Sequence, residues 1–239
     1  MALFAAAPRM SLTLRVLSHL LRYPDAELRA HLGELRDALR DERALTVSRL
    51  AELDRLLDRL RAQPGLESEA AYVELFDRGR GRSLHLFEHV HGDSRDRGPA
   101  MISLAQTYEQ AGLYLAPGEL PDFLPVALEY ASTQPAAEAR AFLSEIAHLL
   151  RVVFTALVQR ESPYASVLAA LLDLAGERAE KVKLADEVPL DEAWAEPAAF
   201  DGCSSAGQAR PGTPQPIQIV KPSSVVPAAR SAASQGARP

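Results

Sequence analysis

The feature that most constrains the fold is the spacing of apolar residues, which recur every three or four positions from residue 10 to about residue 175. An α-helix turns once in about 3.6 residues, so this spacing places them on one face of each helix. No stretch in this region alternates with the period of two that marks a half-buried strand. The sequence therefore predicts an all-α fold, a single compact multi-helix domain.

Turn and capping residues divide this region into separate helices. Asp25 is placed to cap the helix that follows "YPD", and Asp122 in "LPDFLPVALEY" is a candidate N-cap. In "ESPYASVLAALLDLAG", Ser162 is a candidate N-cap and Gly176 follows the last helical residue. Between these signals lie apolar stripes at 12–21, 28–39, 50–60, 101–115 and 142–157.

Composition and charge exclude several classes of protein. The 26 Lys and Arg residues against 32 Asp and Glu give a net charge of −6, without the clustered basic excess that nucleic acid or an anionic membrane needs. The apolar run in "MALFAAAPRM" has no basic residue before it, unlike a signal peptide. One cysteine, Cys203, excludes an internal disulfide. We expect a cytoplasmic protein that binds no nucleic acid and does not insert into a membrane.

The domain boundaries follow from composition. Residues 1–9 are expected to form a flexible N-terminus, and residues 10–200 the helical domain. From residue 201 the chain is rich in Ala, Ser, Gly and Pro and poor in large apolar residues. Residues 201–239 are therefore expected to form a disordered tail, in which "PIQIV" at 216–220 is a candidate docking strand.

Two histidines in "HLFEHVH" have the spacing of a helical metal site. His85 and His89 stand at i and i+4, which would place both rings on one helix face. The zinc-protease pattern needs a glutamate directly after the first histidine, and Leu86 holds that place. A metal-dependent hydrolase is thus an alternative that the sequence disfavours, and histidines that cap, stack or line a surface are the simpler interpretation.

The stretch "GDSRDRGPAM" at 92–101 places several charges where a helical pattern resumes. Asp93 favours a helix start, because carboxylates stabilise the positive end of a helix. Arg95 and Arg97 are unfavourable near that end, because their positive charges lie close to the positive end of the helix. Another interaction must offset this cost. Hydrogen bonds to a partner's backbone carbonyls would supply it, and so would ion pairs within the fold to Glu74, Glu88 or Glu129.

Several motifs together resemble one known family. They are "YVELFDRGRGRSLHLFEHVHGDSRDRGPAM" at 72–101, "LPDFLPVALEYAS" at 120–132 and "LDEAWAEPAAF" at 190–200. In this order and spacing they resemble the NarJ-type nitrate reductase molybdenum cofactor assembly chaperones, also called respiratory nitrate reductase delta subunits. That group lies within the wider TorD/DmsD family of redox-enzyme maturation proteins. The resemblance covers nearly all of residues 10–200.

The resemblance implies a cytoplasmic all-helical chaperone that catalyses no reaction and holds no permanent cofactor. Such a protein binds the N-terminal segment of the nitrate reductase catalytic (alpha) subunit. It keeps the apo-enzyme competent for insertion of the molybdenum cofactor, and of an iron-sulfur cluster, before the enzyme docks on its membrane subunit. Proteins that deliver the molybdenum cofactor are a second class of partner compatible with this role.

The resemblance also implies residues of a peptide groove. In the wider family an aromatic residue followed at i+3 and i+4 by apolar residues lines this groove, as does a proline-aspartate pair at a helix start. The matching residues are Tyr72, Leu75, Phe76, Pro121 and Asp122, with Leu124 beside the pair. Core packing explains the first three equally well. The residues expected to shape the groove's rim are Asp93, Arg95, Arg97 and Glu129.

A second chaperone function within the same family stays open. A proofreading chaperone for a twin-arginine-exported molybdoenzyme, such as dimethyl sulfoxide or trimethylamine N-oxide reductase, would share the fold. The long Pro-containing tail and the "LPDFLP" form argue against it. A helical regulator of nucleic acid is disfavoured by the negative charge and by the lack of a basic recognition helix.

Overall fold

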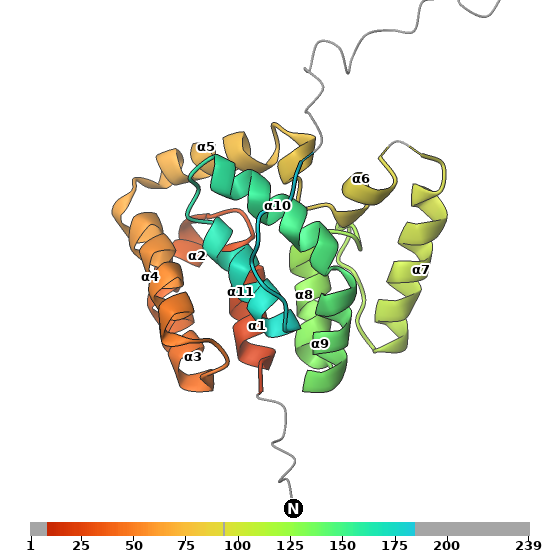
Figure 1. Cartoon of the computed structure of the whole chain (residues 1–239), viewed down its shortest axis with the longest axis horizontal. Coiled ribbons are helices and arrows are strands. Elements are labelled where there is room, and N and C mark those ends of the chain that lie inside the picture. The colour runs from red at the N-terminus through yellow and green to blue at the C-terminus, as the bar shows by residue number, and fades with distance from the viewer. Residues whose placement is uncertain (1–8, 93, 185–239) are drawn as a thin grey trace, which may run out of the picture. The chain divides into compact units, whose positions relative to one another are not determined.

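A computed structural model describes residues 9–92 and 94–184 of the chain, with the side chain of Arg80 left out. Every regular element in these residues is helical, which confirms the predicted fold class (Figure 1). The elements are α1 (Ser11–Leu20), α2 (Ala26–Ala30), α3 (Leu32–Glu42), α4 (Val47–Ala62), α5 (Gly65–Phe76), η1 (Arg80–Arg82), α6 (Leu86–Val90), α7 (Arg97–Gln110), α8 (Leu124–Thr133), α9 (Ala136–Glu145), α10 (Ala147–Gln159) and α11 (Ala165–Ala175).

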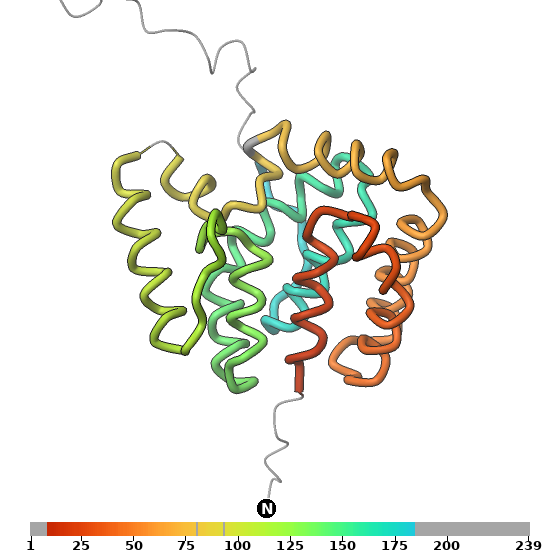
Figure 2. Tube along the Cα trace, turned by 180° about the vertical axis from the view of Figure 1, so that it is seen from behind, coloured from red at the N-terminus to blue at the C-terminus, as the bar shows by residue number. Residues whose placement is uncertain are grey.

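Helix α1 lies in the middle of the core. It packs against α8, α3 and α11, and Figure 2 shows it in red beside the green α8. Its apolar face is completely buried at Leu14, Leu17 and Leu20. Truncating a buried leucine to alanine costs about 2–5 kcal/mol, so this face holds the surrounding helices together.

Helix α11 is apolar except at Ser166 and Asp173, and every residue of it except Ala165 and Asp173 is buried. It ends as predicted, because Gly176 takes the left-handed conformation (φ 84°) that glycine adopts at little cost. Its start differs from the prediction. A turn closed by the Ala165 N–H donating to the Ser162 carbonyl (3.1 Å) precedes the helix, so α11 begins at Ala165 and Ser162 is not its N-cap.

Two of the apolar stripes are divided by breaks that their spacing did not reveal. The stripe at 28–39 breaks at His31, between α2 and α3, although Asp25 caps α2 as predicted by accepting from the Leu28 N–H (2.8 Å). The stripe at 142–157 bends by 65° between α9 and α10. A stripe keeps its spacing through such a bend because both halves still face the core.

Helix α7 is attached to the rest of the fold by few side chains. Of the stripe at 101–115, Tyr108 is buried, whereas Met101, Leu104 and Ala105 are half-buried. The Tyr108 hydroxyl donates to the Pro121 carbonyl (3.0 Å), and its ring lies 4.8 Å from that of Tyr130. Tyr108 thus attaches the C-terminal part of α7 to α8 and to the segment before it.

No single helix among the described residues is long and apolar enough to span a bilayer, whereas α9 and α10 taken together across their bend reach that length and composition. The predictions for residues 1–8, Asp93, the motif at 190–200, Cys203 and the tail at 201–239 fall outside the described residues. The proposed boundaries of the helical domain therefore stay predictions.

Candidate functional site

Two of the three predicted groove residues on α5 point into the core. Tyr72 and Phe76 are buried, and their rings lie 4.8 Å apart with Tyr164 of the α10–α11 turn in edge contact with both. The Tyr72 hydroxyl donates to the Leu21 carbonyl (2.7 Å). Burial raises the pKa of Tyr72 well above its usual range. These two side chains attach α5 to the end of α1 and to α11.

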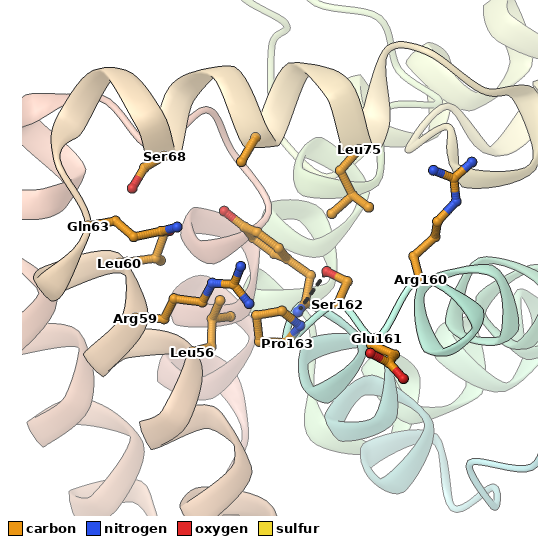
Figure 3. A pocket seen from close by; sticks show the side chains of 12 residues that line it. Leu56, Arg59, Leu60, Gln63, Ser68, Leu75, Arg160, Glu161, Ser162 and Pro163 are labelled. Carbon is orange, nitrogen blue, oxygen red and sulfur yellow. Dashed lines mark hydrogen bonds between the residues drawn. The ribbon is translucent and has the colours of Figure 1, made fainter.

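Leu75, the third of them, lines an open cavity of about 350 Å³. The walls come from the end of α4, from α5 and from the α10–α11 turn, as Figure 3 shows. Its apolar lining is Leu56, Leu60, Ala71, Leu75, Pro163 and Tyr164, and its polar lining is Arg59, Gln63, Ser68, Arg160, Glu161 and Ser162. The volume is at the lower end of the range of ligand pockets, which suits one or two side chains of a partner.

Asp122 is fully buried and joins three segments of the chain. One carboxylate oxygen accepts from the Phe87 N–H (3.2 Å) and lies 3.5 Å from the Arg97 guanidinium, and the other lies 3.2 Å from His85 Nδ1. The prediction that Asp122 caps α8 is wrong. The N-cap position belongs to Phe123, and the carboxylate turns away to the first turns of α6 and α7.

Pro121 and Leu124, the neighbours of Asp122, are also buried. The Leu124 N–H donates to the Leu84 carbonyl (2.8 Å), which fastens the start of α8 to the segment before α6. Leu124 belongs to the same apolar core as Tyr72 and Phe76. Of the predicted peptide-binding residues, Leu75 is the one that lines the cavity, and the binding role of all six stays a prediction.

Of the predicted rim residues, Arg95, Arg97 and Glu129 belong to the part of the chain that the structure describes. Arg97 lies 3.8 Å from Glu88, one of its anticipated partners, and Arg95 is exposed. Glu129 accepts instead from Arg22 (2.9 Å), on the other side of α8. Of the three carboxylates that the sequence offers to these arginines, Glu88 lies beside Arg97, whereas Glu129 pairs with Arg22 and Glu74 with Arg78 (2.7 Å).

His85 and His89 are both engaged within the fold. His85 precedes α6 as its N-cap residue and packs on the ring of Phe123 (5.2 Å), so the two histidines do not share a helix face. His89 Nε2 lies 2.8 Å from the Ser83 carbonyl. Within residues 9–92 and 94–184, no three His, Cys, Asp or Glu side chains are grouped so that they could hold a metal ion.

The cavity includes residues that sequence reasoning did not single out as functional. Arg59 is one of several arginines along α4, and Arg160 and Tyr164 flank the turn between α10 and α11. No motif joins them, since about one hundred residues separate the two walls. The sequence pattern nearest to the cavity is "SPY" at 162–164, which by itself indicates only the start of a helix.

A comparison of the sequence with models of protein families adds a second kind of observation to this geometry. The sequence model of the nitrate reductase delta subunit family matches residues 21–170, which include every helix lining the cavity. The chain belongs to the nitrate reductase delta subunit family. Its α5, α8 and cavity all lie within the matched residues.

Named relatives share most of their length with this delta-family chain. The nitrate reductase molybdenum cofactor assembly chaperone NarJ of Escherichia coli strain K12 is 41% identical over 205 residues, which are 86% of this chain and 80% of that protein. NarJ of E. coli O157:H7 has the same identity and coverage. Because these relatives are assembly chaperones and not catalysts, the delta-family chain is not an enzyme.

A solved structure shares the fold. The crystal structure of a redox enzyme maturation protein from Archaeoglobus fulgidus superposes with a TM-score of 0.50 at 19% identity, and covers 74% of this chain and 100% of that one. At this identity the likeness concerns the fold alone.

Proposed function

We propose that this delta-family chain is an assembly chaperone for nitrate reductase, and that it binds the N-terminal segment of the catalytic (alpha) subunit. It holds the apo-enzyme until the molybdenum cofactor and an iron-sulfur cluster are inserted, in the cytoplasm and before docking on the membrane subunit. The observation that carries the proposal is the 41% identity to the E. coli assembly chaperone over 86% of this chain. Proteins that deliver the cofactor are further partners.

The cavity beside α5 supports a peptide site there. Leu75 and the leucines of α4 give it an apolar floor, and an amphipathic peptide helix inserts apolar side chains into hollows of this kind. Tyr72 and Phe76 act indirectly: they pack in the core and so fix the position of α5, which carries Leu75. Pro121, Asp122 and Leu124 act in the same way on the start of α8.

Calorimetric titration tests this proposal with a synthetic peptide of about fifteen residues from the start of the cognate catalytic subunit. We expect wild-type protein to bind it, and Leu75→Ala to bind at least about tenfold more weakly, because a contact worth about 1.4 kcal/mol is lost. Val73→Ala is the matched control, since Val73 stands on α5 but lines a different hollow. Absence of wild-type binding contradicts the proposal.

The same titration separates the two chaperone functions. A twin-arginine leader from another molybdoenzyme replaces the nitrate reductase peptide in the second arm. Binding of the leader, with none of the nitrate reductase peptide, would assign the chain to the proofreading branch. The 41% identity to nitrate reductase chaperones favours the first outcome.

A further inference from the structure

Two arginines stand on opposite sides of the cavity, whose lining has one carboxylate, Glu161, so positive side chains outnumber negative ones here in an otherwise acidic protein. Arg59 reaches in from α4 and Arg160 from the end of α10, on either side of Ser162 and Pro163 in Figure 3. Both side chains are exposed, and neither forms an ion pair with another residue in the part of the chain that the structure describes. Arg22 and Arg49, by contrast, are held by carboxylates at 2.8–2.9 Å.

The floor between the two arginines includes the ring of Tyr164, which core side chains and a backbone hydrogen bond hold in place. The Tyr164 side chain is 7% exposed, and the rings of Tyr72 and Phe76 hold it from behind (6.1 and 5.2 Å). Glu161 forms the turn beside Arg160 with a positive φ of 51°, a conformation that is uncommon for residues other than glycine. The turn is closed by the Ser162 N–H, which donates to the Leu157 carbonyl (3.0 Å). The cavity is thus preformed in the free protein.

The hollow on the other side of α5 has the opposite charge. Its volume is about 270 Å³, and it is lined by Tyr23, Leu66, Glu69, Ala70, Val73, Glu74 and Arg78. Here Arg78 is neutralised by Glu74 and Glu69 accepts from the Tyr23 hydroxyl (3.0 Å). One helix therefore separates a hollow with two unpaired arginines from a hollow with a net negative rim.

We propose that the cavity of Arg59, Arg160 and Tyr164 selects an apolar side chain that has a carboxylate beside it in the partner's N-terminal segment. The apolar side chain enters between Leu75 and Tyr164, and the carboxylate pairs with the two arginines at the mouth. Guanidinium groups bind carboxylates through strong, directed hydrogen bonds. This inference rests on the proposed function and adds to it the chemical feature that the site recognises.

The first test removes the charge and keeps the fold. Arg59→Gln with Arg160→Gln should weaken binding of the cognate peptide by about tenfold, since two charge-assisted hydrogen bonds from side chains that are exposed in the free protein are lost together. Arg55→Gln with Arg61→Gln is the matched control, because both arginines are exposed on α4 and do not line the cavity. A peptide in which every Asp and Glu is replaced by Asn and Gln should bind wild type as weakly as the intact peptide binds the double variant.

The second test fills the cavity. Ala71 and Ala70 are both exposed on α5, and they line the positive and the negative hollow respectively. Ala71→Phe should abolish peptide binding, whereas Ala70→Phe should leave it within about twofold, with cooperative melting in both. If wild type binds the peptide and both the arginine pair and Ala71→Phe behave as their controls do, the inference is overturned and the proposed function stands. If wild type does not bind, both fail.

Discussion

Replacing Asp122 with alanine is expected to lower the free energy of unfolding by about 3 kcal/mol, a large part of the stability of a domain this size. The carboxylate is fully buried and accepts the Phe87 N–H at the start of α6. Without it, this N–H loses its partner inside the protein, and Arg97 keeps only its long contact of 3.8 Å to Glu88. The start of α6 would then keep its two backbone hydrogen bonds to the segment before α8, Leu124 N–H to Leu84 and Leu86 N–H to Asp122, and α7 would be held there through Tyr108.

Urea unfolding measures this effect, with two variants that separate its causes. Asp122→Asn keeps the size and one acceptor oxygen, so it should cost about half as much as alanine. Asp96→Ala removes an exposed carboxylate from the same segment and should cost less than about 0.5 kcal/mol. If Asp122→Ala proved no more harmful than Asp96→Ala, the carboxylate would not be the link between α6, α7 and α8.

The sequence was sufficient to predict the fold class and several helix ends. Apolar spacing predicts helices because each turn must place an apolar side chain toward the core. This requirement does not depend on which other elements form that core. Asp25 and Gly176 act through atoms of their own helix, so local sequence predicts both correctly. The break at His31 and the bend at Ile146 left the spacing of their stripes almost unchanged, and spacing alone could not reveal them.

The candidate site was harder to predict because its geometry depends on distant residues. Tyr72, Leu75 and Phe76 belong to one helical spacing pattern. Tyr72 nevertheless points into the core, whereas Leu75 lines the cavity. Asp122 was placed as a local cap, whereas its partners Phe87 and His85 lie more than thirty residues away. Only the packing of α4, α5 and α11 decides which side chains reach a common hollow.

Alkaline unfolding is expected to be steep, because three buried tyrosines must stay neutral in the folded protein. Burial raises the pKa of Tyr72, Tyr108 and Tyr164 well above the ordinary value of 10.0. In the unfolded chain the three hydroxyls ionise near that ordinary value. Their contribution to stability is therefore fully present below about pH 10 and is lost as the pH rises toward the folded pKa.

The expected loss is about 1.4 kcal/mol for each pH unit and each tyrosine above about pH 10, which makes about 4 kcal/mol per unit for the three. Urea unfolding between roughly pH 9 and pH 11.5 measures this slope. Tyr164→Phe removes one ionisable hydroxyl and keeps the ring, so it should reduce the slope by about a third. Tyr114→Phe should not change it, since Tyr114 is 81% exposed. An equal slope in wild type and Tyr164→Phe would mean that the ionisation of other groups, such as lysines, governs alkaline unfolding.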